Sequence, residues 1–222
     1  TDTLDCTGQI TAQNPVPELS EERLREAAAL FTGDIRQVPP AFSALKHKGA
    51  PLYRYARNGT PVEKPARAVR IESIRITNVV LPEVHFEVTC SAGTYIRSLC
   101  ADMGRELGCG GHLSRLIRTR SSGFGLKDAV QLDELAQVDS RTDLNRLVGP
   151  MADALADMPV CRADRRLEEK IRHGRPVSGP ELNLDSELTQ GTRIKVRDTE
   201  NRLAAVIEKE ADKIVDSYCC VF

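Results

Sequence analysis

The chain has 222 residues and a formal net charge of −1, because 31 Lys and Arg residues face 32 Asp and Glu residues. Charged residues make up 28% of the chain and hydrophobic residues 41%. No stretch approaches the roughly 20 consecutive apolar residues that a membrane-spanning helix needs. The composition therefore excludes a membrane-spanning protein and an intrinsically disordered one, and we expect a soluble protein of one or two domains.

The seven cysteines form no pattern typical of a disulfide framework or a metal site. Their number is odd, no Cys-x-x-Cys pair occurs, and no set of cysteines and histidines has the spacing of a zinc site. We therefore expect reduced thiols, no bound metal and a cytoplasmic protein. The cysteines are Cys6, Cys90, Cys100, Cys109, Cys161, Cys219 and Cys220.

The near-zero net charge hides a strong segregation of charge along the chain. Residues 1–35 hold two basic and seven acidic residues, whereas residues 36–127 hold fifteen basic and six acidic ones, a balance of +9. The remaining residues return a balance of −5. A basic segment of this kind is typical of a surface that meets phosphates, because Lys and Arg displace the counterions of nucleic acid. An internally ion-paired surface is the alternative, and charge alone does not decide between the two.

The first part of the chain predicts two short helices separated by a loop. Ser20 can cap a helix that carries an apolar stripe and ends at Gly33. Residues 37–49 contain two adjacent prolines and a glycine, so we expect an extended loop with little fixed structure of its own. A second helix is predicted over residues 52–57, because an Asn-Gly pair follows it.

The middle of the chain predicts a β-hairpin followed by a helix. Apolar and polar residues alternate over 67–80 and over 84–90, which is the period of a half-buried strand. We expect these two strands to pair in antiparallel fashion around Pro82. A helix is predicted over 98–107 and ends at Gly108.

The last part of the chain predicts helices and then a small β-rich unit. Residues 128–158 carry spaced leucines and methionines with few glycines, which favours helices. The predicted fold class is α+β, with a mixed, mainly antiparallel sheet and flanking helices in residues 1–158 and a β-rich domain in residues 159–222. In the second domain we expect a helix over 167–172 and strands over 192–196, 203–208 and 214–221.

Four blocks of sequence carry a specific resemblance, at residues 37–46, 52–59, 91–99 and 107–113. They resemble blocks of TruB-type tRNA pseudouridine synthases. The opening residues 1–8, with the pattern Thr-Asp-Thr-x-Asp-x-x-Gly, match a further block of this family, and the terminal β-rich unit resembles its PUA domain. The resemblance therefore covers essentially the whole chain.

The resemblance implies an incomplete pseudouridine synthase fold and the isomerisation of uridine 55 in the T loop of tRNA, without a metal or organic cofactor. The target base has to be flipped out before an enzyme can reach its glycosidic carbon. The implied partner is the T-arm of tRNA, and we expect the loop at 37–49 to become ordered only on RNA. The enzyme is expected to be cytoplasmic and, at full length, monomeric. A relative in the guide-RNA-dependent branch is the less favoured alternative.

Residue by residue, the resemblance implies three active-site side chains. Tyr95 corresponds to a tyrosine that stacks on the target base, Arg97 to the arginine that pairs with the catalytic carboxylate, and Leu116 to an apolar pocket residue. A carboxylate nucleophile needs such a cation to stay ionised in a closed pocket. Basic and aromatic side chains are the types that hold RNA. The expected RNA contacts are Lys46, Lys48, Tyr53, Arg54, Arg57, His112, Arg115 and Arg118.

One necessary piece of the family's active site is absent from these 222 residues. The family's nucleophilic aspartate lies in a Gly-x-Leu-Asp-x-x-Ala-x-Gly-x-Leu block, and Asp5 does not fit it, because Cys6, Thr7 and Gly8 follow. We therefore expect the chain to be the C-terminal portion of a longer enzyme and to be inactive alone. The alternative is a non-catalytic module that holds or remodels tRNA. The native reading frame upstream of Thr1 distinguishes the two.

Overall fold

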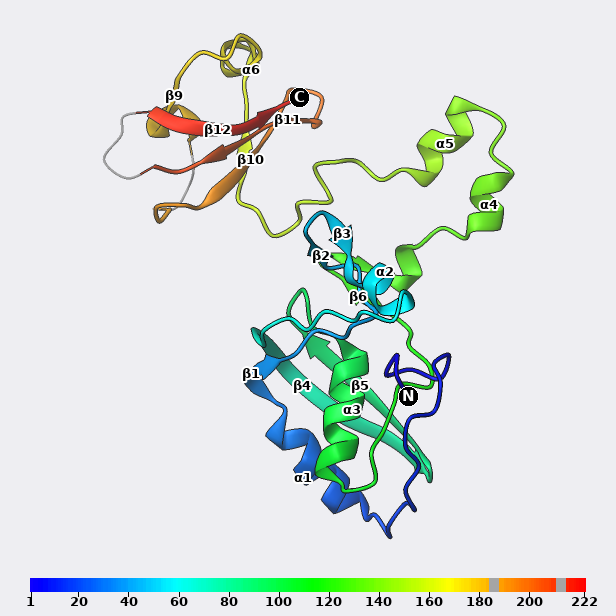
Figure 1. Ribbon diagram of the computed structural model, residues 1–222. Helices are drawn as coiled ribbons and strands as arrows, with labels where there is room; N and C mark the ends of the chain where they lie inside the picture. Colours follow the sequence, from blue (N-terminus) through cyan, green and yellow to red (C-terminus); the bar gives the residue numbers. More distant parts are fainter. Residues whose placement is uncertain (184–187, 211–214) are drawn as a thin grey trace. The chain divides into compact units, whose positions relative to one another are not determined.

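The computed structural model describes residues 1–183, 188–210 and 215–222, and the chain forms two compact units, Thr1–Ile117 and Arg118–Phe222 (Figure 1). Both units combine helices with small sheets whose strands pair mainly in antiparallel fashion. The expected α+β class is therefore confirmed. Among the described residues, no helix is both long enough and apolar enough to cross a membrane.

A three-stranded antiparallel sheet forms the centre of the first unit (Figure 1). Its order is β1 (Gly33–Gln37), β4 (Arg67–Val80) and β5 (Glu83–Cys90), and the predicted pairing of the last two strands is confirmed. Strand β1 is not predicted by its own sequence, because the residues Gly-Asp-Ile-Arg-Gln contain a single large apolar side chain. Its pairing with β4 defines it, from Gly33 opposite Ile71 to Gln37 opposite Arg67.

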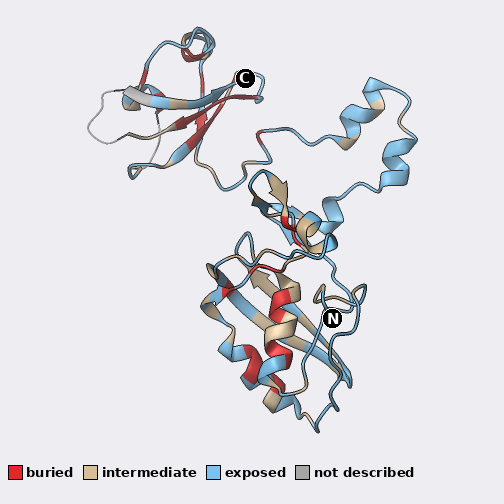
Figure 2. Ribbon diagram, in the orientation of Figure 1, coloured by how far each residue is buried: buried red, intermediate tan, exposed pale blue. Residues whose placement is uncertain are grey.

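Two helices pack on one face of this sheet, as the sequence predicts. Helix α1 spans Glu21–Leu30, and its cap Ser20 accepts a hydrogen bond from the amide of Arg23. Helix α3 spans Ile96–Glu106 and begins two residues earlier than expected. Burial of each larger core side chain contributes about 1.5–3 kcal/mol, so this contact fixes α3 against the sheet. The buried core consists of Ala28, Ile71, Leu99 and Met103 (Figure 2).

The loop after β1 is packed against neighbouring residues, and the expectation that it becomes ordered only on RNA stays a prediction. Pro39, Pro40 and the side chain of Ser43 are buried. The carbonyl of Ser43 accepts a hydrogen bond of 3.0 Å from the amide of Tyr53, which ties the loop to the next helix. Burial of the apolar proline rings and the hydrogen bond to the Ser43 carbonyl together hold this loop, which local sequence rules describe as irregular.

A small hairpin and a helix follow this loop. Strands β2 (Lys46–His47) and β3 (Ala50–Pro51) pair with each other, and helix α2 spans Leu52–Arg57, as predicted. The side chain of Leu52 is fully buried and anchors the helix, whereas Arg54 and Arg57 are exposed. The hairpin and helix thus present basic side chains on a fixed backbone.

The second unit begins with short elements that bury little. The expected helices between residues 128 and 158 are confined to α4 and α5, and neither of them has a buried residue. The leucines whose spacing predicts these helices have exposed side chains, and Leu132 is 83% exposed. The elements are β6 (Arg120–Ser121), β7 (Phe124–Gly125), the 3-10 helix η1 (Leu126–Asp128), α4 (Leu132–Ala136) and α5 (Arg141–Leu147).

A five-stranded sheet of order β8-β10-β11-β12-β9 completes the second unit. The predicted helix and three strands are present, except that Ile214, the first residue of the last predicted strand, lies outside the described residues. Two short strands are added at the edges, of which β8 runs parallel to β10. The core lies between α6 and the sheet and includes Ile171, Ile194 and Ile207 (Figure 2). The elements are β8 (Val160–Arg162), α6 (Arg165–Arg172), β9 (Val177–Ser178), the 3-10 helix η2 (Gly179–Leu182), β10 (Arg193–Arg197), β11 (Leu203–Glu208) and β12 (Val215–Val221).

The residues just before Pro159 also pack on this sheet. The Lys195 side chain is only 3% exposed, and its Nζ donates hydrogen bonds to the carbonyls of Ala152 at 3.0 Å and Leu155 at 2.7 Å. Ala152 shares a small buried cluster with Leu203. The segment around Ala152 therefore belongs to the second unit, and the domain boundary expected between residues 158 and 159 stays a prediction.

Candidate active site

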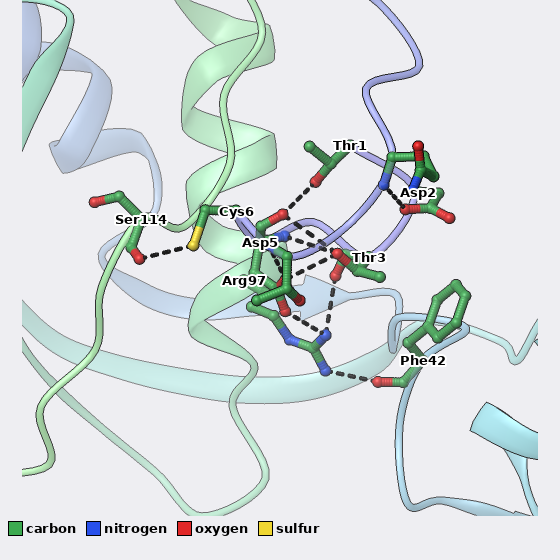
Figure 3. Close-up of polar contacts among 10 residues, drawn as sticks. Thr1, Asp2, Thr3, Asp5, Cys6, Phe42, Arg97 and Ser114 are labelled. Carbon is green, nitrogen blue, oxygen red and sulfur yellow. Dashed lines mark hydrogen bonds and ion pairs between the residues drawn. The ribbon is translucent and has the colours of Figure 1, made fainter.

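Arg97 is the centre of a polar network in the first unit (Figure 3). It lies in the first turn of α3, and its guanidinium reaches two other segments of the chain. Nη1 donates to Asp5 Oδ2 at 3.0 Å and to the Thr3 carbonyl at 2.9 Å, and Nη2 donates to the Phe42 carbonyl at 2.6 Å. Charge-assisted hydrogen bonds from a planar guanidinium fix its orientation as well as its position.

The N-terminal segment holds Asp5 in place for this contact. Backbone hydrogen bonds join it to the strand-like segment after α3: the Leu113 amide donates to the Leu4 carbonyl at 3.0 Å, and the Cys6 amide donates to the Leu113 carbonyl at 2.9 Å. Leu4 takes a positive φ of 61°, which turns the chain there. Residues that lie more than a hundred positions apart in the sequence thus set the place of the Asp5 carboxylate.

The Asp5 carboxylate accepts hydrogen bonds at both of its oxygens (Figure 3). Oδ1 accepts hydrogen bonds from the Thr7 hydroxyl at 2.6 Å, the Thr7 amide at 3.0 Å and the Thr3 hydroxyl at 2.9 Å. The Thr7 hydroxyl, with the Thr3 and Arg97 hydrogen bonds, lowers the pKa of Asp5 to about 2 against the opposing effect of burial. The carboxylate is therefore ionised at neutral pH and forms a partly buried ion pair with Arg97, each side chain being 22% exposed.

Tyr95 is held at both its backbone and its ring. The side chain of Gln37, which is 1% exposed, donates to the Tyr95 carbonyl at 3.0 Å and accepts from the Tyr95 amide at 2.7 Å. The guanidinium of Arg67 lies over the ring, 5.0 Å from its centroid. The neighbouring Ser98 hydroxyl donates to the Val38 carbonyl at 3.1 Å. The loop after β1 is thus bound to the start of α3 next to both Tyr95 and Arg97.

The structure brings two of the three expected active-site residues together. Tyr95 and Arg97 share the start of α3, whereas Leu116 lies in an irregular segment and is 56% exposed. Sequence reasoning missed Gln37 and Arg67, and it did not foresee Asp5 as the carboxylate on Arg97. Within the described residues, the Arg97 Nε–H donates to no acceptor, so the guanidinium keeps a donor for a further anion.

The expected RNA contacts that are basic differ from Arg97, because none of them has an acidic partner among the described residues. Lys46, Lys48, Arg54 and Arg57 lie on the β2–β3 hairpin and α2 and are exposed. Arg57 stacks over the ring of Tyr53 at 5.3 Å. In the part of the chain that the structure describes, none of the expected basic contacts forms an ion pair. The remaining three are His112, Arg115 and Arg118, all of them exposed, with Arg118 at the start of the second unit.

Other basic residues of the same segment are paired. Arg70 lies 3.0 Å from Asp34, and Arg75 lies 2.7 Å from Glu87, on the exposed face of the sheet. The alternative of an internally ion-paired surface therefore holds for the sheet and not for the hairpin and α2.

The described cysteines and acidic residues do not form the grouping that a metal site needs. All seven cysteines are free thiols. Over residues 1–183, 188–210 and 215–222, no three His, Cys, Asp or Glu side chains are grouped so that they could hold a metal ion. The polar network around Arg97 is built from a cation, a carboxylate, hydroxyls, main-chain carbonyls and a main-chain amide.

Comparison with known proteins gives a consistent result along the chain. Residues 1–96 match the family model described as the TruB family pseudouridylate synthase N-terminal domain, and residues 97–156 match the tRNA pseudouridylate synthase B C-terminal domain. The chain is 41% identical over 209 residues to tRNA pseudouridine synthase B of Syntrophus aciditrophicus, covering 93% of this chain and 66% of that protein. It is 38% identical over 206 residues to the protein of the same name from Burkholderia mallei, covering 93% and 68%. The chain thus spans about two thirds of the length of these relatives.

Solved structures resemble the chain in fold. A crystal structure of a Cbf5-Nop10-Gar1 complex matches with a TM-score of 0.70 and 22% identity, over 93% of this chain and 63% of that one. An H/ACA RNP bound to a substrate RNA containing 2'-deoxyuridine matches with a TM-score of 0.70 and 20% identity, over 93% and 62%. At this level of identity the likeness establishes a shared fold.

Proposed function

This chain belongs to the TruB family of pseudouridylate synthases, and from that premise we propose that it carries the RNA-holding part of an enzyme that isomerises uridine 55 in the T loop of tRNA. The observation that carries the proposal is the fixed guanidinium of Arg97, which lies beside Tyr95 at the start of α3 and keeps an unused Nε–H. Such a donor suits the catalytic carboxylate that the family pairs with this arginine.

The nucleophilic aspartate is proposed to come from a segment upstream of Thr1. Asp5 is a poor candidate, because its Oδ1 accepts three hydrogen bonds and the residues that follow it, Cys6, Thr7 and Gly8, do not fit the family's nucleophile block. A carboxylate with a pKa of about 2 is also a weak nucleophile, since nucleophilicity falls with basicity. We assign Asp5 the role of holding Arg97 from one side while the nucleophile takes the other. No metal or organic cofactor enters this scheme.

The target uridine has to leave its stack to reach this site. In the proposal, Tyr95 stacks on the flipped base, Leu116 contributes an apolar wall, and the unpaired basic residues of the hairpin and α2 bind the phosphates of the T-arm. Residues 159–222 act as a PUA-like RNA-binding domain appended to a catalytic domain that includes residues 1–158. The enzyme is proposed to work in the cytoplasm as a monomer. The higher identity to TruB-type relatives than to the Cbf5 chains favours the stand-alone branch over the guide-RNA-dependent one.

The experiment compares the 222-residue chain with the protein extended upstream to its native start. Both are incubated with a T-arm transcript that contains 5-tritiated uridine, and released tritium reports isomerisation. We expect release by the extended protein only, and none from a transcript with cytidine at position 55. Release by the 222-residue chain that is lost in Asp5→Asn would overturn the upstream placement of the nucleophile.

A non-catalytic tRNA-binding module is the second candidate, and the exposed basic residues of the hairpin and α2 would serve it equally well. It predicts tight binding of the T-arm by the extended protein with no tritium release and no pseudouridine in the recovered RNA. An upstream reading frame that lacks the Gly-x-Leu-Asp block would support the same candidate.

A further inference from the structure

Two side chains that lie opposite each other in the sheet converge on Tyr95. Gln37 ends β1 and Arg67 begins β4, and the two are paired residues of the antiparallel ladder. Directly opposed residues of an antiparallel pair project from the same face of the sheet. Gln37 holds the Tyr95 amide and carbonyl, and Arg67 covers one face of the Tyr95 ring at 5.0 Å from its centroid. One strand pair therefore sets both the backbone and the ring of this residue.

A contact with the neighbouring main chain fixes the position of the Arg67 guanidinium. Its Nη2 donates to the Gly93 carbonyl, and its Nε is buried with no hydrogen-bond partner among the described residues. Within the described part of the chain, the partners of the guanidinium are thus one carbonyl and the Tyr95 ring. Gly93 has a φ of +85°, and a Cβ there would lie 3.2 Å from Arg67 Nη2. With the guanidinium in place, the turn before Tyr95 leaves little space for a side chain at position 93.

We propose that Arg67 is a positioning residue for Tyr95: it occupies one face of the ring, so that the flipped base stacks on the opposite face. The inference rests on the proposed function. A guanidinium attracted to the ring face and bound to a carbonyl resists displacement more than an apolar side chain would. Restricting the ring to one orientation prepares the stacking surface before RNA arrives, which removes an ordering step from the reaction.

The test uses the full-length enzyme with Arg67→Met, Arg67→Lys and the control Arg70→Met. Arg70 lies on the same strand, is exposed and is paired with Asp34, outside the site. Single-turnover rates at saturating tRNA are measured together with tRNA affinity over a range of salt concentrations. We expect Arg67→Met to lower the rate about tenfold, with affinity and salt slope within about twofold of wild type. Arg67→Lys should recover part of the rate, and Arg70→Met should match wild type.

A second readout follows the ring directly. The chain has four tyrosines, so the ring signals of Tyr95 in a 13C-tyrosine spectrum are identified by their loss in Tyr95→Phe. We expect these signals to shift in Arg67→Met and Arg67→Lys and to stay in place in Arg70→Met.

Two results would overturn the proposal while the wild-type enzyme remains active. One is an unchanged rate with unchanged ring signals in Arg67→Met. The other is weaker binding with a shallower salt slope and a normal rate at saturation, which would make Arg67 a phosphate contact. If the wild-type enzyme forms no pseudouridine, the proposed function fails first, and that outcome is distinct from both.

Discussion

Two polar regions of the first unit differ in whether their basic side chains have partners inside the fold. Around α3, Arg97 and Arg67 are partly buried and have carbonyl, carboxylate or ring partners inside the fold. On the β2–β3 hairpin and α2, the basic side chains are exposed and form no ion pair with any described residue. Cations with internal partners fix geometry, whereas cations without partners are available to phosphates. The following predictions test this division.

The largest effect is expected for Arg97. In the full-length enzyme, Arg97→Ala removes the donor to the carboxylates and to two main-chain carbonyls, and we expect the rate of pseudouridine formation to fall roughly a thousandfold. The free energy of unfolding should fall by about 2 kcal/mol, because Asp5 and the carbonyls lose their partner. Tritium release and urea unfolding measure the two quantities.

Arg105→Ala is the matched control for Arg97. Arg105 lies on the same helix but is 78% exposed and forms an ion pair with Asp102 one turn away. We expect rate and stability close to wild type, since exposed pairs of this type contribute about 0.3–0.5 kcal/mol. A loss equal to that of Arg97→Ala would show that the helix, and not the guanidinium network, is what the reaction needs.

Gln37→Met should destabilise the unit by about 2 kcal/mol, because the Tyr95 amide and carbonyl each lose a buried hydrogen bond. Methionine keeps a similar volume, so packing changes little. Chemical denaturation gives the free energy of unfolding, and Gln13→Met, at an exposed position of the same unit, should leave it unchanged. Equal stability of the two variants would mean that the Tyr95 backbone finds other partners.

The exposed hairpin is tested by neutralising Arg54 and Arg57 together. Arg54→Gln with Arg57→Gln should weaken tRNA binding about tenfold near 0.1 M salt and reduce the salt slope by between one and two, since each phosphate contact contributes about 0.7–0.9 to that slope. Arg75→Gln is the control, because its partner Glu87 already neutralises it. The same slope in all three proteins would remove α2 from the RNA interface.

The smallest effect is expected for Asp5 and depends on pH. The folded-state pKa is about 2, below the ordinary value of 3.8, so the ionised carboxylate stabilises the fold above about pH 4, and this contribution is lost as the pH falls toward 2. We expect Asp5→Asn to be less stable than wild type by about 1 kcal/mol at pH 7, allowing for its partial exposure, and the difference to shrink at pH 3. Urea unfolding across this range measures it. Asp34→Asn, exposed and paired with Arg70, should show no such trend.

Much of the first unit could be predicted from local patterns. The capped helix after Ser20, the strand alternation over β4 and β5 and the apolar face of α3 are each set by neighbours in the sequence, and the structure agrees with them. Tyr95 and Arg97 were found through a motif, which the structure places at the start of one helix.

The partners of these residues could not be found in this way. Asp5 and Arg97 are 92 positions apart, and Gln37 and Tyr95 are 58 apart. The first pair forms only once the N-terminal segment lies beside Leu113, and the second only once the sheet and α3 have come together. Strand β1 has too few apolar residues to be recognised without its partner β4. In the second unit the leucines of α4 and α5 predict helices correctly but give no sign that their side chains stay exposed.

Two of the acceptors that hold Arg97 are the main-chain carbonyls of Thr3 and Phe42. Every amino acid supplies such an oxygen, so exchanging the side chain at either position leaves the acceptor in place. Chain length is a different matter. Adding or deleting one residue between Val38 and Phe42 would move the carbonyl by several ångströms and break the contact. Thr3 and Phe42 should therefore tolerate exchange of their side chains with respect to this contact, while the stretch before Phe42 should be intolerant of insertions and deletions.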